Sequence, residues 1–200
     1  WLPLDLSARK VLVTANNAVG TLTVIDVPSY EVIGEINVVP DIDIRKKELG
    51  HKWKISQAVT TIQLADDVKF SNDGTVMYVS RGSLADVAAF DVATGTLLWS
   101  CDVDGLKANH MNLTEDGSTI YVSAIAKRRV NVIDTRTGTR RDCNIATGRY
   151  PHGVEFPKKP DLSPPTEVAI GEMKGRYLVI VDMASCTVTE KIDFGGGVRP

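Results

Sequence analysis

The chain has 200 residues, of which 43% are hydrophobic, and a formal net charge of −2. This length and hydrophobic content fit a single globular domain with a sizeable core. The near-neutral charge excludes a global positive field that would recruit nucleic acid or an acidic membrane, and the sequence has no run of about 18 apolar residues that would span a bilayer.

The first predicted strands form one unit at residues 1–38. Apolar alternation indicates four strands in this unit, at 2–6, 10–14, 20–26 and 31–38. The chain begins inside the first of these strands and not with methionine, so we expect any targeting segment to lie outside this numbering.

A charged insertion at 39–65 follows the first unit. The interval from Asp26 to Asp91 is 65 positions, against 43 from Asp91 to Asp134, so roughly 22 residues have been added. The segment 45–54 is rich in lysine and arginine. Insertions in a repeat fold lie in loops on one face, so we predict a solvated surface loop or flap, with a binding element as the alternative.

The second unit, at 66–103, and the third, at 108–146, share one order of strands. The predicted strands are 68–70, 76–80, 87–91 and 97–101 in the second unit, and 110–113, 119–123, 129–134 and 140–145 in the third. The fourth unit, at 150–194, has predicted strands at 152–156, 176–182 and 187–194, with a proline-rich loop at 157–165 in place of a short turn.

Every unit contains an apolar, β-branched run that ends in Asp and is followed by small turn residues. These residues are Asp26, Asp91, Asp134 and Asp182. Such a side chain accepts hydrogen bonds from backbone amides of the following turn, which indicates a hairpin in each unit. A period of about 40–50 residues with several strands per period is typical of a β-propeller. We therefore predict an all-β fold, a β-propeller of four-stranded antiparallel blades with about four blades present.

The three cysteines indicate no disulfide framework, because their number is small and odd. Cys101 and Cys143 occupy equivalent positions in successive units. Equivalent positions of neighbouring blades lie far apart at the rim of a propeller, so we predict no bridge between these two residues. The cysteine content alone does not indicate a compartment.

Three segments resemble the YVTN-repeat (YncE-like) β-propeller family. They are 70–80, with the sequence FSNDGTVMYVS, 132–138, with VIDTRTG, and 148–154, with GRYPHGV. The resemblance extends over nearly the whole chain outside the insertion and implies a periplasmic, cell-surface or secreted protein. The same repeat occurs in lactonase-like enzymes, in propeller subunits of redox enzymes and in non-catalytic binders, so it implies a fold more than a function.

The number of units departs from the family pattern. Propellers of this family usually have about seven or eight blades. The last five residues, 196–200, align with 147–151 at the entry to the next unit. We expect either half of a longer protein or a natural half-propeller that closes with a second copy of itself, because an open array leaves exposed edges.

The best candidate site comes from aligning the units. Asp67, His110 and His152 fall at the same place, 43 and 42 positions apart, at the start of the innermost strand. Equivalent residues of successive blades converge there, at the mouth of the central channel. One carboxylate and two imidazoles are suitable ligands for a divalent metal ion such as zinc, iron or copper.

Further polar residues lie beside these three predicted metal ligands. Asp66, Asn109 and Arg149 complete the set of channel-mouth candidates. The alternatives are that these side chains line a wet channel, that they bind a metal or an anionic ligand, or that they perform acid–base catalysis. The sequence has no Gly-x-Ser-x-Gly nucleophile elbow.

Two functions follow from these observations. The first is a non-catalytic, extracytoplasmic scaffold that binds a ligand or a protein. Its partner would be another protein, or a second copy completing the ring, with a small molecule as a further ligand. The alternative is a metal-dependent or redox enzyme, or a subunit of one, with its site at the channel mouth. A basic hairpin containing 127–129, Arg136 and 140–141 more simply protects an edge strand than binds a polyanion, so no nucleic-acid partner is expected.

Overall fold

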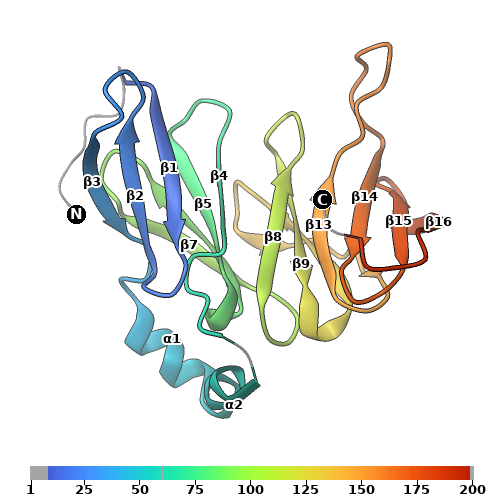
Figure 1. Ribbon diagram of the computed structural model, residues 1–200, viewed down its shortest axis with the longest axis horizontal. Helices are drawn as coiled ribbons and strands as arrows, with labels where there is room; N and C mark the ends of the chain where they lie inside the picture. Colours follow the sequence, from blue (N-terminus) through green and yellow to red (C-terminus); the bar gives the residue numbers. More distant parts are fainter. Residues whose placement is uncertain (1–8, 60, 199–200) are drawn as a thin grey trace.

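The computed structural model describes residues 9–59 and 61–198. Within these residues the chain forms four antiparallel sheets, which follow one another along an open arc (Figure 1). The all-β class is confirmed. The first sheet has the order β1 (Val11–Asn16), β2 (Thr21–Asp26) and β3 (Val32–Asn37). The strand predicted at 2–6 lies outside the described residues.

The second sheet is four-stranded and follows the prediction closely. Its strands are β4 (Asp67–Phe70), β5 (Val76–Arg81), β6 (Asp86–Asp91) and β7 (Leu97–Asp102), each hydrogen-bonded to the next. The short 3₁₀ helix η1 (Gly82–Leu84) connects β5 to β6, and η2 (Ile125–Lys127) takes the same place in the third sheet.

The third sheet corrects one predicted strand. It contains β8 (Ala108–Leu113), β9 (Thr119–Ala124) and β10 (Arg129–Asp134), followed by two short strands, β11 (Thr139–Arg140) and β12 (Ile145–Ala146). The single strand predicted at 140–145 is therefore wrong. Both short strands pair with β10, and the chain between them leaves the sheet at Cys143.

The fourth sheet contains a strand that the sequence analysis did not identify. Its order is β13 (Pro151–Glu155), β14 (Glu167–Glu172), β15 (Tyr177–Asp182) and β16 (Thr187–Asp193). The missed strand is β14, which follows the proline-rich loop directly. Its central residues 168–171 are buried, and it pairs with both of its neighbours.

The core lies between successive sheets, and side-chain alternation along the strands explains it. In β5, Met77 and Val79 pack toward the first sheet, whereas Tyr78 packs toward the third. In β9, Ile120 packs toward the second sheet and Tyr121 toward the fourth. Because successive strand residues point to opposite faces, each inner sheet supplies two apolar faces to the stack.

The repeated Asp residues form the predicted turns. The Asp91 carboxylate accepts a hydrogen bond from the Thr94 amide at 2.7 Å, and Asp134 accepts one from the Thr137 amide at 3.0 Å. In the fourth sheet, Asp182 accepts one from the Ser185 amide at 2.8 Å. The pKa of each carboxyl is lowered, because hydrogen bonds stabilise its ionised form. The largest effect comes from the Thr94 hydroxyl at Asp91, the Ser185 hydroxyl at Asp182 and the Thr137 amide at Asp134.

The insertion is helical, which corrects the prediction of a solvated loop or flap. It forms α1 (Ile42–Leu49) and α2 (His51–Val59), which lie together below the first and second sheets in Figure 1. Arg81 of β5 is fully buried and bonds both Asp41, at the start of α1, and Asp86 of β6. Arg45 of α1 also reaches Asp86, at 3.0 Å. This ionic cluster fixes the helices to the second sheet.

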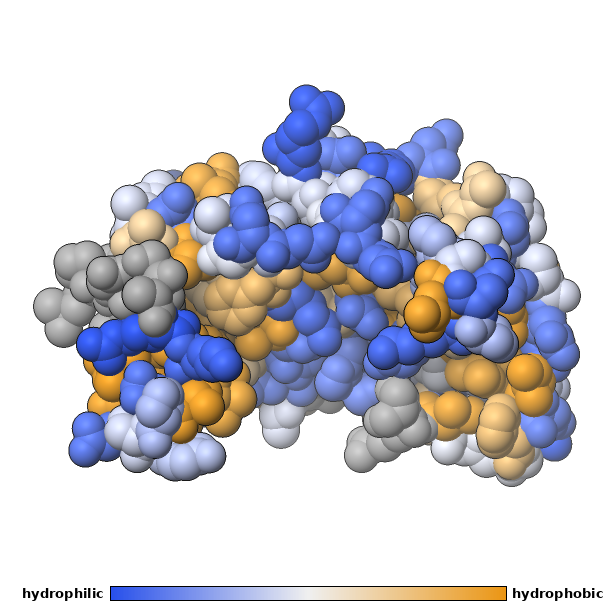
Figure 2. Space-filling view, turned by 90° about the horizontal axis from the view of Figure 1, so that it is seen from above, coloured by the Kyte–Doolittle hydropathy of each residue, from blue (hydrophilic) through white to orange (hydrophobic). Residues whose placement is uncertain are grey.

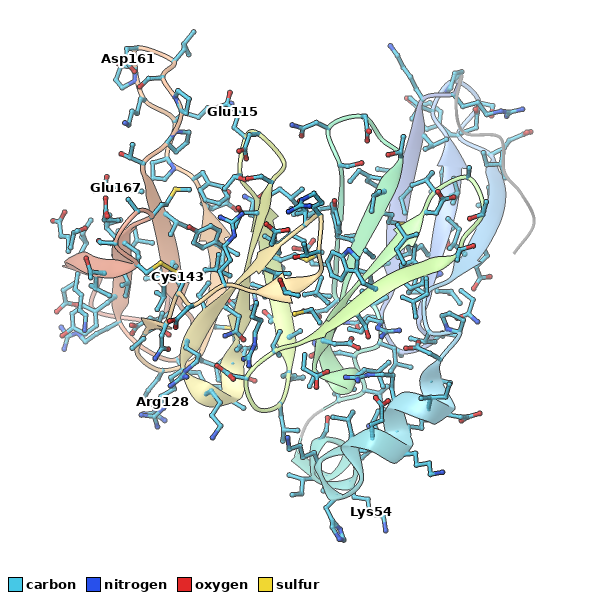
Figure 3. All side chains as sticks on the ribbon, turned by 180° about the vertical axis from the view of Figure 1, so that it is seen from behind. Lys54, Glu115, Arg128, Cys143, Asp161 and Glu167 are labelled. Carbon is cyan, nitrogen blue, oxygen red and sulfur yellow. A yellow bond between two sulfur atoms is a disulfide. The ribbon has the colours of Figure 1, made fainter. Side chains whose placement is uncertain are left out.

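A disulfide joins Cys143 and Cys186, a pairing that was not predicted from the sequence. It connects the segment between β11 and β12 to the turn between β15 and β16, so it links the third sheet to the fourth; Figure 3 labels Cys143. Cys101 is a free, buried thiol, and burial raises its pKa to about 11. In the described part of the chain, no helix has the length and apolar character needed to cross a membrane.

Candidate functional site

The first strands of three sheets lie next to one another and carry the predicted site residues. Strand β8 contacts both β4 and β13, and Figure 1 shows β8 and β13 side by side. Seen from above, the molecule is hollowed along one side, and hydrophilic residues lie at the bottom of the hollow (Figure 2). These strands therefore present equivalent positions of three sheets to one another.

The structure places Asp67, His110 and His152 in one row. The imidazole rings of His110 and His152 pack with their centroids 4.2 Å apart, at an interplanar angle of 38°. His110 Nδ1 lies 3.9 Å from Asp67 Oδ2, which also accepts a hydrogen bond from the Met111 amide at 3.0 Å. The His110 side chain is 44% exposed and that of Asp67 is 17% exposed, so a ligand in solution can reach the row.

This row is not a ready coordination sphere. Among the described residues, no group of three or more His, Cys, Asp or Glu side chains is arranged to hold a metal ion. Both oxygens of Asp67 already have partners, because Oδ1 accepts the Val68 amide at 2.9 Å and Oδ2 accepts the Met111 amide. The arrangement offers the imidazoles for stacking and the row's polar atoms for hydrogen bonding with a ligand.

A second polar layer lies beside the row and connects three sheets. Asp66 accepts hydrogen bonds from Asn17 at 2.9 Å and from Asn109 at 2.6 Å. Burial raises the pKa of Asp66, although the Asn17 hydrogen bond and the charges of His110 and Lys107 act in the opposite direction. Asp66 and Asn109 were predicted from the sequence, whereas Asn17, in the turn that follows β1, was not.

The buried side-chain amide of Asn109 has an acceptor oxygen that a ligand or water could bind. Asn109 is 5% exposed, and its Oδ1 has no hydrogen-bond partner within the described part of the chain. The same holds for Asn17 Oδ1. A buried acceptor without a partner costs stability, so two such acceptors around one carboxylate mark a place where a bound ligand or water would complete the network.

Arg149 does not belong to the row. It lines a separate cavity of about 310 Å³, together with Lys107, at the ends of β13 and β8 that face α2. Five of the six channel-mouth candidates therefore occupy the row and its adjoining polar layer, whereas the sixth belongs to a different cavity.

Comparisons with known proteins give a fold but no family. No protein-family model matches the chain, and no curated protein matches it. Among solved structures, the chain is similar to a chain of Kuenenia stuttgartiensis hydrazine synthase, with a TM-score of 0.66 and 21% sequence identity. The match covers 92% of this chain and 46% of that one, so this chain spans about half the length of the solved chain. At this identity, the similarity shows the fold alone.

Proposed function

We propose that this chain is a ligand-binding or protein-interaction module of the β-propeller type, related to the YVTN-repeat family and acting without catalysis of its own. One observation carries the proposal. The row of Asp67, His110 and His152 and the Asp66 layer bring polar groups from successive sheets together. Equivalent inner-strand positions that converge in this way form a typical recognition surface of repeat folds.

The arrangement of the sheets supports a propeller-like role for the whole chain. Four twisted antiparallel sheets pack face to face along an arc, as blades do, and the arc is open. A protein partner or a second copy of the chain is the natural means of completing the ring, because either would cover the apolar surface at the two ends. Exposed apolar side chains occur in both terminal sheets: Leu12, Val32, Ile192 and Phe194.

The disulfide supports a location outside the cytoplasm. Disulfides persist in oxidising compartments and are rare in reducing ones. The Cys143–Cys186 bridge therefore agrees with the periplasmic, cell-surface or secreted location that the family resemblance implies.

A ligand screen tests the binding function. Pools of amino acids, sugars and nucleotides are tested by ligand-observed NMR against the untagged protein, the double variant His110→Ala/His152→Ala and the matched surface variant Lys191→Ala, whose residue is on the exposed strand β16. We expect at least one compound to bind the unmodified protein and the Lys191 variant, to be lost in the double variant, and to be recovered unchanged.

Two results would contradict this proposal. One is chemical conversion of the bound compound. The other is stoichiometric zinc, iron or copper in the purified protein that disappears in the double variant, since this would support the metal-dependent or redox alternative. Folding of the double variant is checked by its thermal unfolding, which should change little because His110 is exposed at the surface of the row.

A further inference from the structure

A basic cavity lies between α2 and the ends of the third and fourth sheets. Its volume is about 310 Å³. The polar side chains that line it come from α2, from the connections before β8 and β13, and from the loops after η2 and β14. They are Ser56, Lys107, Arg128, Arg149, Tyr150 and Lys174. Figure 3 shows Arg128 at the same end of the molecule as Lys54 of α2, opposite the end that carries Glu115 and Asp161.

The charge of this cavity is not balanced by its own walls. Of the residues that the structure describes, four with cationic side chains line it, Lys107, Arg128, Arg149 and Lys174, and none with a carboxylate does. None of the four forms an ion pair with a carboxylate among the described residues. By contrast, Arg129 and Arg140, on the outer part of the same sheet, both pair with Asp104. Converging cations without counterions create a strongly positive potential inside a cavity.

The nearest carboxylates already have amide partners. Asp66 attracts Lys107 electrostatically, but its oxygens accept hydrogen bonds from Asn17 and Asn109. Glu172 is 2% exposed, and its Oε1 accepts the Gly148 amide at 2.7 Å. Neither Asp66 nor Glu172 is among the described residues that line the cavity, whose walls present the four cations.

Two of the four cations, Lys107 and Lys174, are held in place by surrounding residues. Lys107 is 7% exposed, and burial lowers its pKa. Lys174 Nζ lies 4.3 Å from the centre of the Tyr150 ring, a cation–π contact that fixes it at the wall. Lys107 and Tyr150 are 43 positions apart and both have left-handed φ angles, of 73° and 65°. The repeat thus presents equivalent positions of two sheets to one cavity.

We propose that this cavity binds a phosphate group, either as inorganic phosphate or as part of a small phosphate monoester. Guanidinium groups match the oxygens of phosphate in a bidentate geometry, and lysines add point charges. The volume suits a small ligand, since it lies near the lower end of the range for ligand pockets, about 300–1,000 Å³. The site is separate from the row of Asp67, His110 and His152, and it does not depend on the function proposed above.

Isothermal titration calorimetry with inorganic phosphate and with glycerol 3-phosphate tests the proposal at constant ionic strength. The variants are Arg149→Gln and Lys174→Gln, with Arg136→Gln as the control. Arg136 is exposed in the turn after β10, and its removal changes the net charge equally. We expect Arg149→Gln and Lys174→Gln each to weaken binding by at least about tenfold, and Arg136→Gln to change it by less than about twofold.

The two ligands distinguish the two sources of the phosphate. Equal affinity for both indicates free phosphate, and tighter binding of glycerol 3-phosphate indicates an organic monoester. Absence of binding at about 10 mM of either probe, or an equal loss in all three variants, would overturn the proposal. Phosphate binding should persist in His110→Ala, so failure of the ligand-binding row and failure of this cavity are told apart.

Discussion

Gly138 shows how one residue links the turn of one sheet to its neighbour. Its φ is +66°, and a Cβ added there would lie 2.5 Å from the indole of Trp99 in β7. The indole Nε1 in turn donates to the Thr135 carbonyl oxygen at 3.2 Å, in the same turn. The turn of the third sheet therefore requires glycine both for its backbone conformation and for contact with the second sheet.

Substituting Gly138 with alanine should therefore lower the free energy of unfolding by more than its backbone strain alone. The control is Gly74→Ala, at a φ of +71° with no atom within 4 Å of the added Cβ. We expect a loss of about 1–2 kcal/mol for Gly74→Ala, from left-handed strain, and a further 1–3 kcal/mol, roughly, for Gly138→Ala from overpacking. Urea unfolding of both variants measures the difference, and equal losses would contradict the packing argument.

A substitution at Asp66, in contrast, should raise the free energy of unfolding. Burial raises its pKa, so the folded state holds a proton that the unfolded state releases, and this contribution to stability decreases as pH rises from about 4 through the raised pKa. Asp66→Asn should raise the free energy of unfolding at pH 7 and remove this pH dependence. A flipped Asn109 amide could accept a hydrogen bond from the new side chain, because its Oδ1 has no partner among the described residues.

The matched comparison for Asp66 is Asp86→Asn. Asp86 is fully buried, but it bonds the guanidinium of Arg81 at 2.6 and 2.8 Å. Neutralising one member of such a pair should cost about 3–5 kcal/mol. Urea unfolding at several pH values separates the two cases, and a loss of stability in Asp66→Asn at pH 7 would show that its charge is structural.

At the scale of elements, the helical insertion depends on ions that lie far apart in sequence. Asp41→Ala should release α1 and α2 from the second sheet, because Asp41 bonds the fully buried Arg81. Its side chain makes no capping hydrogen bond at the start of α1, so the substitution removes no capping interaction from the helix. We expect trypsin to cleave at 45–54 at least about tenfold faster in this variant, since cleavage follows the population of the opened state.

The control for this experiment is Asp43→Ala. Asp43 is an exposed residue in the first turn of α1 and has the same charge. Its cleavage should match that of the unmodified protein. Equal acceleration in both variants would mean that the helix itself, and not its attachment, was weakened.

The hairpin strands could be predicted because the residues that specify each strand and its turn are neighbours in the sequence. Each Asp-ended apolar run and its turn are contiguous, and the alignment of the units also brought Asp67, His110 and His152 to one row. The helices were missed because α1 has no clear apolar face, and Arg45, its buried residue, is held by partners in β6 and β7. The split fourth strand of the third sheet was missed because Cys143 bonds a residue 43 positions away.

The candidate site was predictable only where equivalent positions carry similar residues. Asn17 and Lys174 were missed, since they lie in turns and reach their sites through contacts between sheets. Arg149 was grouped with the channel mouth because it lies three positions before His152, and its side chain lines the basic cavity.

At the scale of the whole molecule, the disulfide should raise the free energy of unfolding because it closes a long loop. It spans 43 residues, so Cys143→Ser/Cys186→Ser should lose about 2–4 kcal/mol. Reductant should destabilise the unmodified protein by a similar amount and leave the double variant unchanged. Cys101→Ala serves as the control, because it removes the free thiol and keeps the bridge, and it should respond to reductant like the unmodified protein. A protein insensitive to reductant would contradict this prediction.

The Cys143–Cys186 bridge also affects the order in which the sheets unfold. In a linear array of sheets, each unit is held mainly by its neighbours, and the terminal units open first. The fourth sheet is covalently tied to the third, whereas none of the described cysteines lies in the first sheet. Fraying should therefore begin at β1–β3 and reach the C-terminal half last. Among the described sheets, the first would then have a shorter lifetime than the third and fourth, which carry the basic cavity.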